Sequence, residues 1–239
     1  MFNPRPQIQR VPIAGLGKGQ DAAWVIDDVL MQPERLRHWA IEHQHRFVAA
    51  PHNAYPGLEW AMDADVSGPL AEFFMLHLRI LLGARRTLSM YSRLSLATLQ
   101  PANLRPLQRL CHRDRFGIAP GQGVAACVIY LFERTELGGT SFYRPRRPVA
   151  EIDADIQRWN AMPDEAFTAE LGAAPAYLTN SNEHFERVCS VPAAWNRAVF
   201  YDGSQFHSSH ITQPELLSAH PASGRLTLNG FFITRLLSA

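Results

Sequence analysis

The stretch Gly224-Arg225-Leu226-Thr227-Leu228-Asn229-Gly230-Phe231-Phe232 alternates between polar and apolar residues. Arg225, Thr227 and Asn229 share one set of alternate positions, and this period of two predicts a β-strand over residues 225–234. A polar row on a strand of core-like composition costs desolvation energy unless it faces water or a partner. The carboxylate of a small ligand is such a partner, because it pairs with Arg225 through a bidentate fork and with the Thr227 hydroxyl.

The rest of the chain reads as helices first and strands afterwards. Helices are expected from Pro33, with an apolar face ending at Phe47, and from Ser67 as N-cap to a stop at Gly83. Further strands are expected at residues 23–26, 88–99, 123–132, 140–143 and 198–201. Residues 149–195 predict a helical insertion whose helices end near Gly172, and the Pro/Gly-rich residues 1–23 predict an N-terminal arm. This order is typical of an α+β, mainly β domain whose sheet is able to close on itself.

Composition excludes several classes of protein. The 239 residues carry a net charge of 23 − 22 = +1 and are 46% hydrophobic, which indicates a packed core without a strong overall field for nucleic acid or a membrane. Lys18 is the only lysine, so lysine Schiff-base chemistry is largely excluded. Three cysteines without a CxxC motif, no signal-peptide pattern and no apolar run of about 18 residues predict a cytoplasmic protein.

Cys111-His112-Arg113-Asp114 is the first stretch able to carry chemistry. On a strand, His112 and Asp114 point to the same face and offer an imidazole and a carboxylate to a divalent metal. A salt-bridged pair without metal is the alternative. The tripeptide also resembles a kinase catalytic loop, but the following Asn and the kinase glycine-rich loop are missing.

A third metal ligand must come from a distant part of the chain. His207 follows the expected strand 198–201 and the turn Asp202-Gly203-Ser204, and it lies 207 − 114 = 93 residues after Asp114. His210, three positions later, is the rival. Two histidines and one carboxylate would form the facial triad of non-haem Fe(II) oxygenases, which leaves three coordination positions open.

Together, His112-x-Asp114, Gly138-Gly139-Thr140, His207 and Arg225-x-Thr227 resemble the iron(II)/2-oxoglutarate-dependent dioxygenases of the prolyl-hydroxylase-like branch. The chain is most similar to a family of uncharacterised bacterial proteins of that superfamily. The matching stretches are 53–58, 108–114, 138–143 and 224–229, and the resemblance covers roughly residues 24–235.

This resemblance implies a single double-stranded β-helix (jelly-roll) domain over residues 24–239, with the N-terminal helices packed on one sheet. It implies Fe(II) held by His112, Asp114 and His207, with 2-oxoglutarate and O₂ as co-substrates. Arg225 and Thr227 are expected to hold the distal carboxylate of 2-oxoglutarate, and Asn229 is a further expected cofactor contact. Relatives often carry a tyrosine upstream of the His-x-Asp pair, where this chain offers Gln108 as a cofactor contact.

The expected reaction is hydroxylation of an unactivated C–H in a small-molecule or peptidyl substrate. Two other functions stay open: a jelly-roll module that binds metal and ligand without catalysis, and a metal-dependent hydrolase or isomerase with the same ligands. The loop Tyr55-Pro56-Gly57 and the insertion 149–195 are candidate lids. Neither nucleic acid nor a membrane is expected as a partner, and a homodimer is left open.

Overall fold

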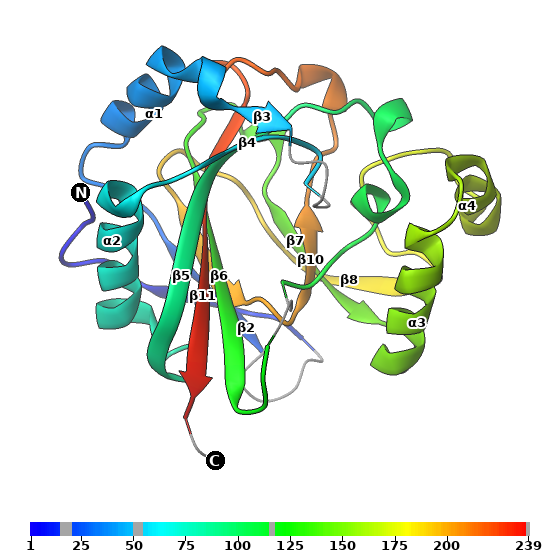
Figure 1. Cartoon of the computed structure of the whole chain (residues 1–239), viewed down its shortest axis with the longest axis horizontal. Helices are drawn as coiled ribbons and strands as arrows, with labels where there is room; N and C mark the ends of the chain where they lie inside the picture. The colour runs from blue at the N-terminus through cyan, green and yellow to red at the C-terminus, as the bar shows by residue number, and fades with distance from the viewer. Residues whose placement is uncertain (15–20, 50–54, 115–117, 238–239) are drawn as a thin grey trace.

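The protein is described by a computed structural model for residues 1–14, 21–49, 55–114 and 118–237, and it contains two antiparallel sheets (Figure 1). The large sheet has the order β1 (Gln9–Pro12), β2 (Ala22–Ile26), β9 (Ala198–Asp202), β6 (Gln122–Tyr130), β11 (Arg225–Leu236), β5 (Ala84–Ala97), β4 (Gly57–Ala61) and β3 (Val48–Ala49). The small sheet has the order β10 (Phe206–Ser209), β7 (Thr140–Pro145) and β8 (Phe185–Val191).

From β5 onward the chain winds between the two sheets. β5, β6, β9 and β11 belong to the large sheet, whereas β7, β8 and β10 belong to the small one. An isolated bridge between His112 and His207 places the segment that joins β5 to β6 beside β10 at the edge of the small sheet. This alternation is that of a double-stranded β-helix, or jelly roll, so the predicted fold class is confirmed.

Two N-terminal helices cover the outer face of the large sheet, on the left of Figure 1. They are α1 (Pro33–Glu42) and α2 (Ala64–Phe73), and α2 continues into a π-helical turn, η2 (Phe74–Leu78). Phe74 stacks on Phe232 of β11 with ring centroids 4.0 Å apart. A Cβ at Gly230 would lie 2.8 Å from Cδ2 of Leu70, so glycine permits the close approach of helix and strand. No helix in the described part of the chain has the length and apolar character needed to cross a membrane.

The start of the second helix differs from the prediction. Asp63, not Ser67, is the N-cap, because its side chain accepts a hydrogen bond from the backbone N–H of Asp65 at 3.1 Å. Pro69 therefore lies inside the helix. The Ser67 hydroxyl instead lies 2.8 Å from that of Ser92 on β5, which attaches the helix to the sheet.

The predicted arm and the predicted insertion both contribute strands. Residues 9–12 of the arm form β1, which pairs with β2 at the edge of the large sheet. The insertion contains α3 (Val149–Asn160) and α4 (Asp164–Leu171), and α4 ends at Gly172 with φ +60°, close to the predicted stop. Its last part, residues 185–191, is β8 of the small sheet and thus part of the jelly roll.

Short 3₁₀ turns complete the described elements: η1 (Gln44–Arg46), η3 (Pro101–Asn103), η4 (Pro106–Arg109), η5 (Thr135–Leu137) and η6 (Pro214–Leu216). Among these, η4 leads directly into the His-x-Asp segment and η5 leads into Gly138 and Gly139. These two turns therefore position residues that the sequence singled out.

Candidate active site

Backbone pairing brings the three candidate metal ligands together. The N–H of His112 donates to the carbonyl of His207 at 2.9 Å, and the N–H of His207 returns a bond of the same length. The N–H of Asp114 donates to the carbonyl of Gly203 at 2.7 Å. The turn before β10 thus holds Asp114, while β10 itself holds His112.

The side chains of His112, Asp114 and His207 converge on one point. One ligand atom from each lies within 4.8 Å of the other two. Nε2 of His112 is 3.6 Å from Oδ1 of Asp114, and Nε2 of His207 is 3.4 Å from Oδ2. Nδ1 of His207 lies 3.0 Å from the carbonyl of Gln205, which favours the tautomer that leaves Nε2 free to bind a metal.

The electrostatics of this cluster suit a cation. Burial raises the pKa of Asp114, against the opposing effects of His207 and Arg93, and its Oδ2 is buried without a hydrogen bond among the described residues. Desolvation, together with the charges of His207 and Arg93, lowers the pKa of His112 well below its usual range, even though 48% of its side-chain surface is accessible. A neutral imidazole and a buried carboxylate oxygen without a donor are the groups that a divalent metal binds and stabilises.

His210, the rival third ligand, lies outside this cluster. Its Nδ1 is 2.9 Å from the hydroxyl of Ser141, which in turn lies 2.6 Å from that of Ser190. His207 and His210 are three residues apart, and only His207 faces Asp114 in the described structure.

Aromatic side chains from both sheets lie beside the cluster. The ring of Tyr201 lies 4.6 Å from that of His207, and Phe142 of β7 lies 6.4 Å from it. Tyr91 of β5 stacks on Phe231 of β11 with centroids 4.7 Å apart. Phe200 and Phe206 belong to separate parts of the core.

Arg225 lies at the start of β11 with only 2% of its surface exposed. Its Nε donates to the carbonyl of Gly138 at 3.1 Å and its Nη2 donates to that of Gly139 at 2.9 Å. The rings of Tyr130 and Phe132 lie 5.9 and 5.8 Å from its guanidinium carbon. No described Asp or Glu pairs with this cation, which is costly for a buried charge.

Gly138 and Gly139 are required by close approaches. Gly138 has φ +86°, and a Cβ there would overlap the carbonyl oxygen of His210. A Cβ at Gly139 would overlap the carbonyl oxygen of Val191. The motif Gly138-Gly139-Thr140 therefore places two backbone carbonyls against the Arg225 guanidinium.

Thr227 and Asn229 extend the polar row of β11. Nδ2 of Asn229 donates to the hydroxyls of Thr227 at 3.0 Å and of Ser95 at 2.9 Å, and Thr227 is fully buried. This polar row does not face water, because Arg225, Thr227 and Asn229 are all buried on the inner face of the strand. The predicted row thus forms a polar cradle whose members share one strand face.

Tyr55 joins this cradle although the sequence indicated only a lid for its loop. Burial raises the pKa of the Tyr55 hydroxyl, while the Arg225 cation and a hydrogen bond with Thr227 oppose that shift. Gln108, the predicted cofactor contact, instead accepts from the N–H of Arg105 at 2.9 Å and donates to the carbonyl of Tyr55 at 3.0 Å. Gln108 therefore positions the Tyr55 backbone and does not itself contact Arg225 or Thr227.

Arg93 and Glu59 are two further charged residues that sequence reasoning missed. Nε of Arg93 lies 2.9 Å from Oε1 of Glu59, and its guanidinium lies 4.8 Å from the ring of Phe231. Its charge acts on both His112 and Asp114. Arg93 lies opposite Asn229 of β11 and Ala61 of β4. These contacts cross between strands, so the local sequence of β5 shows only its period-two pattern and does not mark Arg93.

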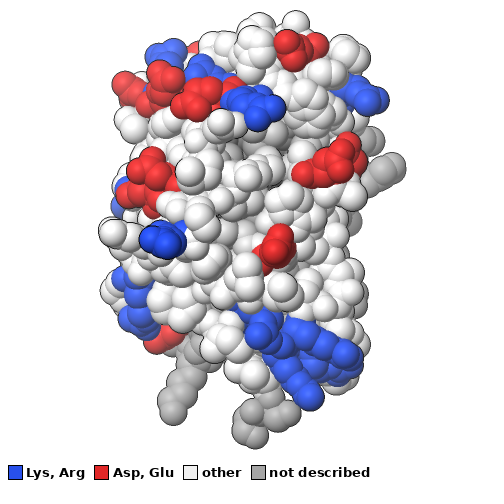
Figure 2. Space-filling model, turned by 90° about the vertical axis from the view of Figure 1, so that its left-hand side faces the viewer, with Lys and Arg blue, Asp and Glu red and all other residues white. Residues whose placement is uncertain are grey.

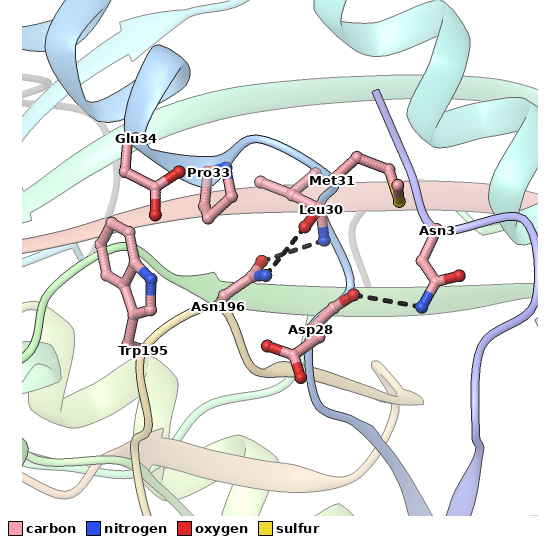
Figure 3. A pocket seen from close by; sticks show the side chains of 8 residues that line it. All are labelled: Asn3, Asp28, Leu30, Met31, Pro33, Glu34, Trp195 and Asn196. Atoms are coloured by element: carbon pink, nitrogen blue, oxygen red, sulfur yellow. Dashed lines mark hydrogen bonds between the residues drawn. The ribbon is translucent and has the colours of Figure 1, made fainter.

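A separate surface hollow lies between the N-terminal segment and Trp195 (Figure 3). Its centre is Asn196, which accepts from the N–H of Leu30 and donates to the carbonyl of Leu30, both at 2.9 Å. None of its lining residues belongs to the triad or the cradle. Because the side-chain amide of Asn196 bonds both backbone groups of Leu30, we interpret the role of this hollow as structural.

Comparison with known proteins gives one family and several solved structures. The sequence profile described as "Family of unknown function (DUF6445)" matches residues 4–232. No curated protein matches the sequence. Identities and TM-scores are low for the solved structures, so these transfer neither a substrate nor a reaction to this chain.

Three of these solved structures illustrate the range of identity and TM-score. The epimerase SnoN from nogalamycin biosynthesis, described as non-heme and alpha ketoglutarate dependent, is 14% identical over 89% of this chain and 78% of its own, with a TM-score of 0.48. A Pseudomonas putida prolyl-4-hydroxylase is 18% identical over 89% and 92%, with a TM-score of 0.43. HygX from Streptomyces hygroscopicus, with nickel and 2-oxoglutarate bound, is 12% identical over 89% and 82%, with a TM-score of 0.46. The profile match, in contrast, spans nearly the whole chain, and it shows that the protein belongs to the DUF6445 family.

Proposed function

We propose that this protein is an Fe(II)/2-oxoglutarate-dependent oxygenase that hydroxylates an unactivated C–H of a small-molecule or peptidyl substrate. The observation that carries the proposal is the buried Arg225 cation. It has no described carboxylate partner, and it lies in the same jelly roll as an open His-Asp-His cluster. A ligand that supplies a carboxylate to Arg225 and oxygen donors to a metal satisfies both sites at once.

The donor set supports iron. Two imidazole nitrogens and one carboxylate form the facial arrangement typical of non-haem Fe(II), with three coordination positions left open. A bound ferrous ion would supply the chemistry that couples O₂ to the decarboxylation of 2-oxoglutarate and the oxidation of a substrate. The hydrogen bond between His207 and the Gln205 carbonyl orients the imidazole for this role.

The cradle suits the far end of 2-oxoglutarate. Arg225 provides the positive charge, and Thr227 and Tyr55 provide hydroxyls beside it. Residues 139–142, which lead into β7, connect the two parts of the site, because Gly139 accepts from Arg225 and Phe142 approaches His207. Three residues of extended strand span about 10 Å. A five-carbon dicarboxylate that binds metal at one end and arginine at the other would link two sites that so short a stretch of chain connects.

Tyr201 and Phe142 exclude water from one side of His207, and the Tyr91–Phe231 stack forms another apolar surface of the jelly-roll interior. A site of this kind keeps a reactive metal from bulk water and leaves room for an organic substrate. The accessible face of His112 marks the side from which that substrate would enter.

Conversion of 2-oxoglutarate to succinate tests this function. We expect the Fe(II)-loaded protein in air to release succinate and consume O₂, and to add one oxygen atom to a component of a free amino-acid mixture or a tryptic peptide digest. The same mixture under nitrogen is the control. Binding of 2-oxoglutarate without any succinate would favour the silent binding module, whereas substrate turnover that needs metal but no 2-oxoglutarate would favour the hydrolase or isomerase.

A further inference from the structure

One end of the molecule exposes large apolar side chains and arginines together. This basic–apolar end lies where β5 begins and β11 finishes, at the bottom of Figure 1. Its apolar members are Met75, Leu76, Ile80, Leu81, Leu236 and Leu237, each between 40% and 65% exposed. Its basic members are Arg79, Arg85, Arg86 and Arg235.

The apolar members come from two distant segments that meet at Gly83. The π-helical turn η2 directs Phe74 and Leu78 into the core, while Leu76 points outward with 65% of its surface exposed. The N–H of Leu237 donates to the carbonyl of Gly83 at 2.9 Å. This bond places the exposed end of β11 beside the exposed turn after the helix.

The four arginines have no described carboxylate partner. Arg235 lies directly opposite Arg86 in the strand register, and like charges in that position destabilise a sheet unless an anion lies between them. Among the described residues, the side chain of Arg79 donates to the backbone carbonyls of Met75 and Arg85. A blue patch at the lower end of the face in Figure 2 shows how closely basic side chains gather there.

Several other arginines of this chain do pair with carboxylates. Arg144 pairs with Glu186, Arg197 pairs with Asp27, and Arg158 pairs with Glu170. The 22 acidic residues nearly balance the 23 basic ones, but none of the described ones pairs with an arginine at the basic–apolar end. A net charge near zero conceals this local concentration of positive charge.

We propose that the basic–apolar end binds an anionic phospholipid surface. Guanidinium groups bind phosphate through paired N–H donors, and protruding leucine and isoleucine side chains enter the interfacial region of a bilayer. A second copy of the chain fits less well, because two such patches would bring eight arginines together. This proposal revises the expectation of no membrane partner, which followed from net charge alone, and it is independent of the oxygenase function.

Sedimentation of the full-length protein with vesicles tests the proposal. We expect binding to phosphatidylcholine vesicles that contain phosphatidylglycerol, no binding to pure phosphatidylcholine, and weaker binding as salt rises. Each arginine near an anionic surface is expected to contribute about fivefold in affinity. R85Q/R86Q should therefore bind roughly 25-fold more weakly, and L76S/I80S should also bind more weakly at equal charge.

The matched control is R35Q/R46Q, which removes two exposed arginines from α1 and η1 at the opposite end of the molecule. It should bind anionic vesicles as the natural protein does. The proposal is overturned if the natural protein ignores anionic vesicles, or if the control loses as much binding as R85Q/R86Q. It is also overturned if L76S/I80S binds vesicles unchanged and instead abolishes self-association in sedimentation velocity.

Discussion

Replacement of Arg225 by glutamine is expected to abolish 2-oxoglutarate binding while leaving the fold intact. Truncation of one partner of a buried charge pair costs about 2–5 kcal/mol, so the Kd should rise by at least about thirtyfold. Glutamine keeps a donor for the carbonyl of Gly138 or Gly139 but removes the charge. Anaerobic calorimetric titration of 2-oxoglutarate into the Mn(II)-loaded protein measures the loss.

The stability of the ligand-free variant separates this effect from misfolding. Arg225 is a buried cation without a described carboxylate partner, so its neutral replacement should leave the free energy of unfolding unchanged or slightly higher. R109Q is the matched control, since Arg109 is equally buried but donates to Thr168 and to the Ala173 carbonyl near α4. An R225Q protein that binds 2-oxoglutarate normally would contradict the role of the cradle.

The second large effect is expected for Asp114→Asn, which keeps the shape of the side chain and removes its charge. Loss of an outer-shell partner of a metal ligand already costs about 10–100-fold in affinity, so loss of a ligand itself should exceed 100-fold. Metal affinity is read by competition with a chromogenic chelator. H210A is the control, and it should bind metal normally because His210 faces Ser141.

The metal-free D114N protein should also be more stable than the natural one at neutral pH. Burial raises the pKa of Asp114 in the folded state, so the folded protein holds this proton more tightly than the unfolded chain. The stability contributed by the protonated form is present at low pH and is lost as the pH rises through the folded pKa. Asparagine avoids the cost of the buried charge, and equal urea midpoints for the two metal-free proteins at neutral pH would count against this account.

Much of the jelly roll could be predicted because the local sequence of its central strands has a clear hydrophobic pattern. The alternation from Arg225 to Thr234 and the apolar run of β6 each follow from side chains that point to opposite faces of one strand. β8 was missed because Phe185–Val191 lies at the small-sheet edge, where partly exposed residues weaken the apolar pattern. The capping role of Asp63 was missed because Pro69 suggested a later helix start.

The site was predictable only where its residues follow one another along the chain. His112 and Asp114 are two residues apart in the segment that bridges to β10, and Arg225 shares a face of β11 with Thr227, so spacing alone relates the members of each pair. Tyr55 reaches the cradle from a loop more than 100 residues before β11, and no local pattern marks that contact. Gln108 was predicted as a cofactor contact on resemblance, and in the structure its side-chain amide bonds the backbone of Arg105 and of Tyr55.

Anaerobic absorption spectroscopy tests the central claim most directly, because chelation of Fe(II) by the 2-oxo acid end of 2-oxoglutarate produces a weak visible charge-transfer band. The account predicts that this band appears when 2-oxoglutarate is added to the Fe(II)-loaded natural protein, saturates at one equivalent, and is absent from D114N. A natural protein that binds Fe(II) but shows no such band at saturating 2-oxoglutarate would contradict the proposal that the triad and the Arg225 cradle form one site.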